Sequence, residues 1–133
     1  MLSKKTQYAL KALGLLAKHY GKGPLLIQDI AADKHIPIKF LENILLELKK
    51  ANILDSKKGR GGGYFLKDSP EKTSLAKVMR TVEGPIALLP CVSLYFYEKC
   101  ADCNEEHCAI NAAFIEARDA ILGVLEHKTL LEL

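Results

Sequence analysis

The sequence has no long apolar stretch. None of its hydrophobic runs approaches the roughly 20 residues that a helix needs to cross a bilayer. At the start of the chain, Lys11 and Lys18 interrupt the apolar residues at helical spacing, and no small-residue cleavage site follows. These features are not typical of a signal peptide. We therefore expect a cytoplasmic protein without a membrane partner.

Patterns for catalysis are also missing. No nucleophile–base pair or carboxylate pair stands out, which argues against an enzyme. The glycine-rich stretch KKGRGGGY, residues 57–64, lacks the Gly-Lys-Ser/Thr triplet of a phosphate-binding loop, and a predicted strand follows it instead of a helix. With 133 residues, the chain has room for one domain, or one domain with a dimerising extension.

Acidic residues are scarce in the first half of the chain. Residues 1–67 hold 13 Lys and Arg against 5 Asp and Glu, whereas residues 68–133 hold 6 against 11. Such asymmetry suggests that the first half meets a polyanion. A solvated lysine-rich surface is the alternative interpretation.

The hydrophobic pattern of the first half predicts three helices and a hairpin. Residues 3–21 form the first helix, which Ser3 caps and Gly21 ends. A turn at Gly23–Pro24 and a short strand at Leu25–Leu26 precede a short second helix. The third helix follows Pro37 and carries a one-sided apolar stripe of Leu41, Ile44, Leu45 and Leu48.

Residues 53–66, ILDSKKGRGGGYFL, have the pattern of a β-hairpin: two apolar segments around a basic, glycine-rich turn. The glycines let the turn close tightly and let its backbone approach a phosphate chain. Helix, short helix, amphipathic helix and basic hairpin follow one another as in a winged helix-turn-helix. The expected fold is therefore mainly α with a small β-hairpin.

A winged helix-turn-helix places its exposed helix in the major groove. There Lys39 could donate to guanine, Asn43 could pair with adenine, and Glu42 could accept from the cytosine amino group. The cations near the start of the chain and in the wing would hold phosphates and make binding salt-dependent. For each residue, a solvated helix face is the alternative. The candidate DNA-binding residues are Ser3, Lys4, Lys5, Tyr8, Lys39, Phe40, Glu42, Asn43, Lys57, Lys58, Arg60 and Gly61.

The second half predicts a short helix, capped by Thr73 or Ser74, and a long last helix from about Ala109 to Glu126. The long helix carries an extended apolar stripe, which we interpret as a dimerisation face; a single-chain core is the alternative. The stripe consists of Ile110, Ala113, Phe114, Ala117, Ile121, Val124 and Leu125.

All four cysteines lie between these two helices, in the pattern C-x8-C-x2-C-x4-C: Cys91, Cys100, Cys103 and Cys108. In a cytosolic protein such clustering indicates metal or redox chemistry rather than structural disulfides. Thiolates bind iron–sulfur clusters and zinc. A thiol switch with nothing bound is the third possibility.

Four segments, TQYALKAL, IQDIA, IPIKFLENILLELKKANIL and KKGRGGGYFL, resemble the Rrf-two family (the IscR, NsrR and CymR type) of bacterial winged-helix transcription factors. The resemblance continues through SLAKVMRTVEGP to the end of the chain. It implies a homodimer that binds a roughly palindromic promoter site. It also places Lys39, Glu42 and Asn43 on the recognition helix and Lys58 and Arg60 in the wing.

In many members of that family three cysteines before the long helix hold a 2Fe–2S or 4Fe–4S cluster. By this resemblance Cys91 and Cys108 match the ends of the ligand segment, with Cys100 or Cys103 between them. The chain departs from the pattern by inserting VSLYFYEK, by its fourth cysteine, and by Asn111 where the best-known pattern has histidine. Either the fourth cysteine or His107 would then complete the set, or the site is a different one. A further alternative is a thiol-sensing member without a cluster.

The sequence thus predicts a winged helix-turn-helix domain at residues 1–83, a sensor loop at 84–108, and a dimerisation helix and tail at 109–133. The expected function is a dimeric repressor or activator of transcription that binds specific double-stranded DNA. The alternative is a metal-binding scaffold or electron carrier whose basic face binds an acidic protein.

Overall fold

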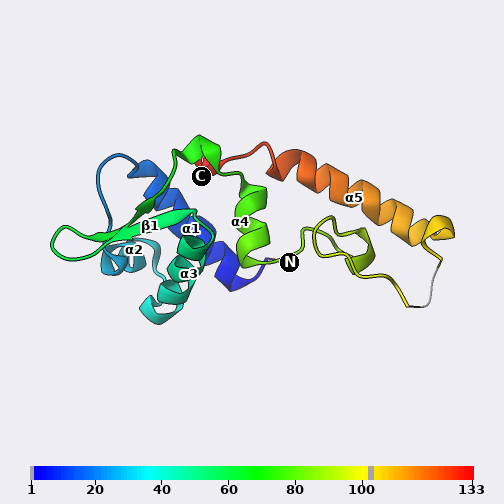
Figure 1. Cartoon of the computed structure of the whole chain (residues 1–133), viewed down its shortest axis with the longest axis horizontal. Helices are drawn as coiled ribbons and strands as arrows, with labels where there is room; N and C mark the ends of the chain where they lie inside the picture. The colour runs from blue at the N-terminus through cyan, green and yellow to red at the C-terminus, as the bar shows by residue number, and fades with distance from the viewer. Residues whose placement is uncertain (1, 102–103) are drawn as a thin grey trace.

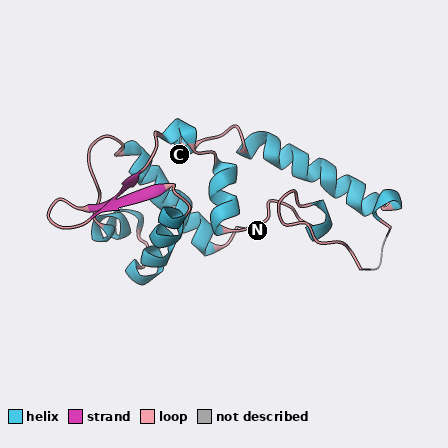
Figure 2. Ribbon diagram, in the orientation of Figure 1, coloured by secondary structure: helices cyan, strands magenta, loops and turns pink. Residues whose placement is uncertain are grey.

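The computed structural model describes residues 2–101 and 104–133. It is mainly helical, with a two-stranded antiparallel hairpin (Figure 2). Helices α1 to α4 and the hairpin form one body, and α5 extends from it as an arm, with residues 84–101 beside it (Figure 1). The elements are α1 (Lys4–Lys18), α2 (Ile27–Lys34), α3 (Ile38–Lys50), β1 (Leu54–Lys57), β2 (Gly63–Leu66), α4 (Leu75–Val82) and α5 (Ala109–Leu125).

Helix α1 begins as the sequence predicts. The Ser3 hydroxyl accepts a hydrogen bond from the Thr6 backbone N–H at 3.2 Å, which satisfies one of the amides left free in the first turn. The helix ends at Lys18, three residues before the predicted stop at Gly21, because the chain turns through His19 and Tyr20 first. Its buried face packs against α2, α3 and α4.

Helices α2 and α3 form the helix-turn-helix. His35 ends α2 in the left-handed conformation, with φ 54°, and Pro37 lies at the N-cap of α3. The four residues of the predicted stripe on α3 are 0–1% exposed and form the centre of the core. Burying a leucine contributes about 2 kcal/mol, so this stripe fixes which face of α3 is left for a partner.

The hairpin pairs Leu54 with Leu66 and Lys57 with Gly63, which leaves residues 58–62 as the wing turn. A Cβ at Gly62 would lie 2.2 Å from the Lys57 carbonyl oxygen, so this turn accepts glycine alone there. The expected strand at Leu25–Leu26 is wrong in extent. Only Leu25 bridges to Tyr64, because Leu26 is already the N-cap of α2.

The end of the chain returns to the first body. The Leu130 N–H donates to the Thr73 carbonyl at 3.1 Å, and the Leu75 N–H donates to the Lys128 carbonyl at 2.8 Å. Leu130 is buried and joins the core of the winged-helix body. The C-terminal end of α5 is therefore held against α4.

The division of the chain into a winged helix-turn-helix domain, a sensor loop and a dimerisation helix stays a prediction. Among the described helices, none is long and apolar enough to cross a membrane.

Candidate nucleic-acid interface and cysteine pocket

The exposed face of α3 carries the three predicted base-contacting residues. Lys39, Glu42 and Asn43 are all exposed, opposite the buried leucine stripe. They occupy the first two turns of the helix, which is the end that a recognition helix presents to base edges. The face offers an ammonium donor, a carboxylate acceptor and an amide that can do both.

Helix α1 meets the start of α3 through an aromatic pair. The rings of Tyr8 and Phe40 lie edge to face, with centroids 5.6 Å apart and an interplanar angle of 83°. Lys4 and Lys11 lie over the Tyr8 ring, 5.8 and 6.0 Å from its centroid. The structure thus brings two predicted aromatic site residues together and places two lysines over the Tyr8 ring.

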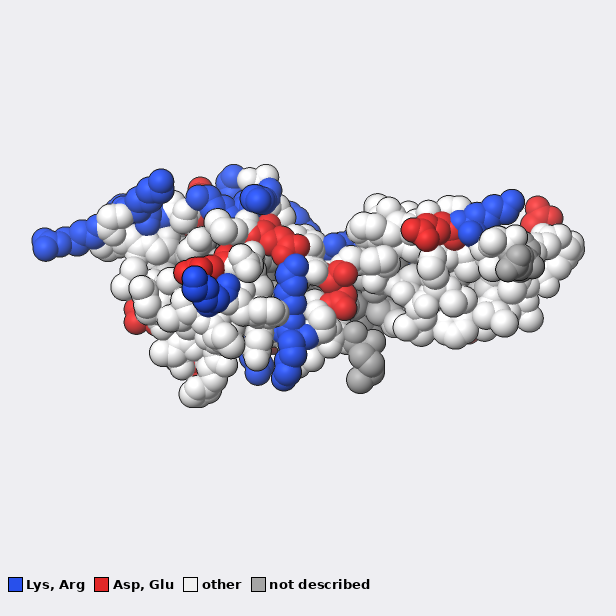
Figure 3. Space-filling model, turned by 90° about the horizontal axis from the view of Figure 1, so that it is seen from below, with Lys and Arg blue, Asp and Glu red and all other residues white. Residues whose placement is uncertain are grey.

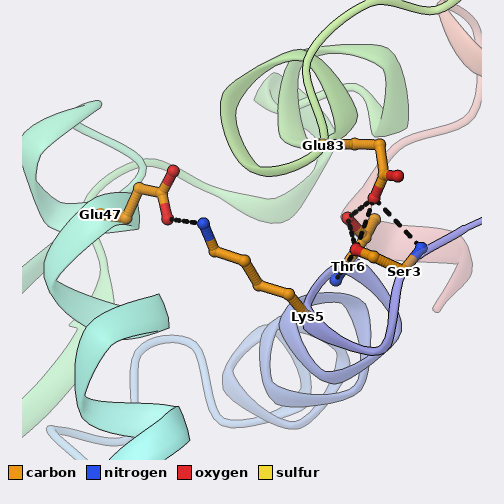
Figure 4. Close-up of polar contacts among 5 residues, drawn as sticks. All are labelled: Ser3, Lys5, Thr6, Glu47 and Glu83. Carbon is orange, nitrogen blue, oxygen red and sulfur yellow. Dashed lines mark hydrogen bonds and ion pairs between the residues drawn. The ribbon is translucent and has the colours of Figure 1, made fainter.

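Two other predicted phosphate contacts are already paired within the protein (Figure 4). The Lys5 ammonium lies 2.6 Å from a Glu47 carboxylate oxygen on α3. The Ser3 hydroxyl and backbone N–H donate to Glu83 at 2.7 and 3.2 Å, and the Thr6 hydroxyl donates to the same oxygen. Contact with DNA would require Ser3 and Lys5 to exchange these carboxylates for phosphates.

Glu83, which accepts hydrogen bonds from the predicted site residue Ser3, was not predicted from the sequence. The hydrogen bonds from the Ser3 and Thr6 side chains hold the pKa of its carboxyl below the usual value of 4.5. It ends α4, directly before the cysteine-bearing segment. No local pattern signals a contact between residues 80 positions apart, so the sequence offered no sign of it.

The wing carries the remaining predicted cations. Lys57, Lys58 and Arg60 are exposed, and Gly61 takes a positive φ of 72° between them and the second strand. Lys and Arg side chains gather on the winged-helix body and at the tip of the hairpin, whereas the arm is mostly uncharged in this view (Figure 3). The Lys49 ammonium donates to the Ser56 hydroxyl at 2.6 Å, which links α3 to β1.

Three cysteines line one cavity of about 370 Å³ beside the start of α5: Cys91, Cys100 and Cys108. Cys108 is the N-cap of α5, where its sulfur accepts from the Asn111 backbone N–H at 3.4 Å. The Asn111 side-chain amide donates to the Cys91 sulfur at 3.5 Å, and this residue is 7% exposed. Asn111 therefore connects two of the predicted ligands.

The donor chemistry of this cavity fits a thiolate-bound group. Cysteine sulfur is the ligand of iron–sulfur clusters and a common ligand of zinc, and an amide N–H to a ligand sulfur stabilises its charge. Cys103 lies outside the described residues, and His107 is exposed. Among the residues the structure describes, no three ligand side chains are gathered as a metal site.

A helix-turn-helix followed by a two-stranded wing defines a winged-helix protein. A family model described as "Rrf2: Iron-dependent Transcriptional regulator" matches residues 2–133, and the chain belongs to this family. The sequence is 40% identical to a putative rrf2-like HTH-type transcriptional regulator of Rhodobacter capsulatus, over 98% of this chain and 89% of the relative. The CymR regulator of Bacillus subtilis is 30% identical, over 99% of this chain and 88% of CymR.

Solved structures agree with this family. CymR, the global cysteine regulator of B. subtilis, superposes with a TM-score of 0.81 at 30% identity and covers 98% of this chain and 92% of its own. The T. potens IscR structure shares the fold, with a TM-score of 0.78 at 24% identity. The match covers 98% of this chain and 83% of the IscR chain. The predicted family and fold class are confirmed. The protein is a transcriptional regulator of the Rrf2 family and not an enzyme.

Proposed function

We propose that this regulator binds specific double-stranded DNA as a homodimer and senses its signal at the cysteine pocket. The observation that carries the proposal is the exposed polar start of α3 in the same winged-helix body as a basic, glycine-built wing. Action on chromosomal DNA implies a cytoplasmic protein.

In this proposal α3 enters the major groove and the wing lies along the adjacent backbone. Lys39 reads guanine and Asn43 reads adenine, because each side chain matches the donor and acceptor pattern of its base edge. Glu42 accepts from cytosine and repels phosphate when misplaced. Lys58 and Arg60 neutralise phosphates, which contributes affinity without sequence preference.

The dimer forms through the arm. Ile110 and Val124 on α5 are 61% and 55% exposed, and Leu94, Tyr95 and Tyr97 of the neighbouring segment are more than half exposed. An apolar surface of this extent on a single chain marks an interaction site, and a second copy of the same surface covers it. Two paired arms would hold two α3 helices at the spacing of DNA half-sites, about 34 Å.

The sensor connects to the dimer because Cys108 begins α5. Any change at its sulfur alters the first turn of the helix that we propose as the interface. We favour an iron–sulfur cluster held by Cys91, Cys108 and further cysteines; bound, it would supply a redox- and iron-sensitive group. Zinc and thiol oxidation are the competing chemistries, and the CymR relative named a cysteine regulator favours the thiol alternative. A tenfold change in DNA affinity needs about 1.4 kcal/mol between the two states.

Gel shifts with fragments of the source genome at two salt concentrations test the DNA-binding part. We expect preference for particular fragments, loss of that preference in Lys39→Ala, and weaker binding in Arg60→Ala. Lys22→Ala, an exposed cation outside the proposed surface, is the matched control. A scaffold or electron carrier would show no fragment preference and no effect of either substitution.

Anaerobic purification followed by an absorption spectrum and iron, sulfide and zinc analysis tests the sensor. A brown protein with matching iron and sulfide supports the cluster. Stoichiometric zinc in a colourless protein contradicts it and leaves the DNA-binding proposal intact. A metal-free protein whose DNA affinity changes with thiol oxidation supports the thiol alternative.

A further inference from the structure

A cleft of about 430 Å³ lies on the winged-helix body, between the end of α1 and the hairpin. Its apolar floor includes Leu16, which lines the cleft and is only 2% exposed. Half-buried Phe65 also lines it. The volume falls within the range of small-molecule sites.

Cations line the same cleft. Side chains alternate along a strand, so Lys57, Phe65 and Lys67 share one face of the hairpin, with the Asp55–Phe65 and Lys57–Gly63 pairs setting the register. Both lysines and His19 line the cleft, and none of its described lining residues is acidic. The acidic residue on that hairpin face, Asp55, accepts from the Ser56 backbone N–H at 2.8 Å.

An apolar floor with cations beside it suits one class of ligand. A duplex phosphate would pair with the cations and leave the apolar floor unused, whereas a neutral apolar molecule would leave the exposed lysines to water. An organic anion with a flat apolar body uses both features. The Lys67 ammonium donates to the side-chain oxygen of Asn52 at 3.2 Å, a residue outside the cleft lining, so a bound carboxylate would have to replace this contact.

We propose that this cleft binds a small aromatic carboxylate or a similar organic anion, and that its occupation weakens DNA binding. The second part rests on the proposed function. Lys57 is the last residue of β1, directly before the wing turn. A ligand carboxylate that pairs with Lys57 removes one of the cations that would otherwise meet phosphate, and each lost phosphate contact lowers DNA affinity.

Titration of the full-length protein with naphthoate, in the absence of DNA, tests the cleft. We expect saturable binding with the largest amide NMR shifts at Gly21 and Gly23, which line the cleft. Lys67→Gln, which lies outside the proposed DNA contacts, should weaken binding about fivefold, the effect of losing one partly exposed ion pair. Lys77→Gln, an exposed lysine on α4 that does not line the cleft, should change nothing.

Three outcomes would overturn the cleft: no saturable binding, equally tight binding of neutral naphthalenemethanol, or shifts concentrated on the apolar face of α5. Fluorescence anisotropy with a bound DNA fragment tests the coupling. Naphthoate should raise the dissociation constant of the wild-type protein for DNA and should have little effect on the DNA affinity of Lys67→Gln. Naphthoate binding without any change in DNA affinity would refute the coupling alone. Failure to bind any DNA would refute the proposed function. The test of naphthoate binding to the cleft would still be valid, because it is done without DNA.

Discussion

The Ser3 hydroxyl donates to a Glu83 carboxylate oxygen at 2.7 Å, across 80 positions of sequence. The contact joins the N-cap of α1 to the end of α4 (Figure 4). Because residue 84 begins the cysteine-bearing segment, this single carboxylate connects the proposed DNA-binding end of α1 with the proposed sensor. Its hydrogen bonds are made by the charged form of Glu83, so they depend on pH.

The folded protein should lose stability as acid protonates Glu83. The hydrogen bonds from Ser3 and Thr6 lower the pKa of this carboxyl in the folded state, so their contribution is present above the unfolded value of 4.5 and is lost as pH falls through the lowered pKa. Glu83→Ala should cost about 1 kcal/mol at pH 7, since the site is partly solvated. Urea unfolding should show the difference shrinking as the pH falls below the unfolded pKa of 4.5. Glu116→Ala, which removes an exposed α5 carboxylate, is the control; a difference independent of pH would contradict the assignment.

Arg60→Ala should weaken binding to all DNA sequences alike. A phosphate contact carries no sequence information, and its loss should reduce the slope of log affinity against log salt by about one. Fluorescence anisotropy over a salt series measures this slope. An unchanged slope would place Arg60 away from the phosphates.

Asn43→Ala should instead relax sequence preference. A bidentate contact to adenine discriminates between bases by about 1–3 kcal/mol. Asn43→Ala should therefore bind the preferred site more weakly than the wild type does. Its affinity for a duplex in which that adenine is replaced should equal that of the wild type. Competition binding with the two duplexes gives the comparison. Equal losses on both duplexes would assign Asn43 to backbone contact or to folding.

Gly62→Ala should distort the wing. The added Cβ would meet the Lys57 and Gly59 carbonyl oxygens at 2.2 and 2.8 Å, and backbone cannot move aside as a flexible side chain can. We expect a loss of about 2 kcal/mol or more in unfolding free energy, together with weaker DNA binding. Gly59→Asn is the control, because that position has a positive φ of 86°, open space around it, and asparagine tolerates this conformation. Similar effects of both changes would contradict a steric cause.

Val124→Asp should separate the dimer without unfolding the chain. Val124 is 55% exposed on the single chain, so a charge there costs little until a second copy covers it. Burial of an unpaired carboxylate costs several kcal/mol, which should raise the dimer dissociation constant at least about a hundredfold. Analytical ultracentrifugation measures this constant, and far-UV circular dichroism checks the fold. A dimer that persists in this variant would move the interface elsewhere.

Cys108→Ser should separate the structural role of this residue from its chemical role. A serine hydroxyl replaces the thiol as N-cap and accepts from the same Asn111 N–H, so thermal stability should be kept or slightly raised. Iron content, or the response of DNA binding to oxidants, should fall strongly, because a hydroxyl is neither a thiolate ligand nor a redox group. Cys108→Ala should lose both properties. An unaltered response in Cys108→Ser would exclude Cys108 from the sensor.

The sequence by itself determined the local structure. The stripe from Leu41 to Leu48 repeats at helical spacing, and glycines separate two apolar segments around the wing, so the period of burial predicted both α3 and the hairpin. Such patterns arise between near neighbours in the chain. The strand predicted at Leu25–Leu26 was too long, because Leu26 is already the N-cap of α2.

Only the tertiary structure decided which distant residues meet. Ser3 and Glu83, Tyr8 and Phe40, and Cys91 and Asn111 are joined by packing between elements, and nothing in the local spacing of either partner records such a contact. The cleft beside the hairpin has the same origin, since its floor and its cations come from α1 and from the strands. Hydrophobic periodicity specifies which face of each element is buried, whereas the direction in which the elements cross specifies which polar groups share a surface.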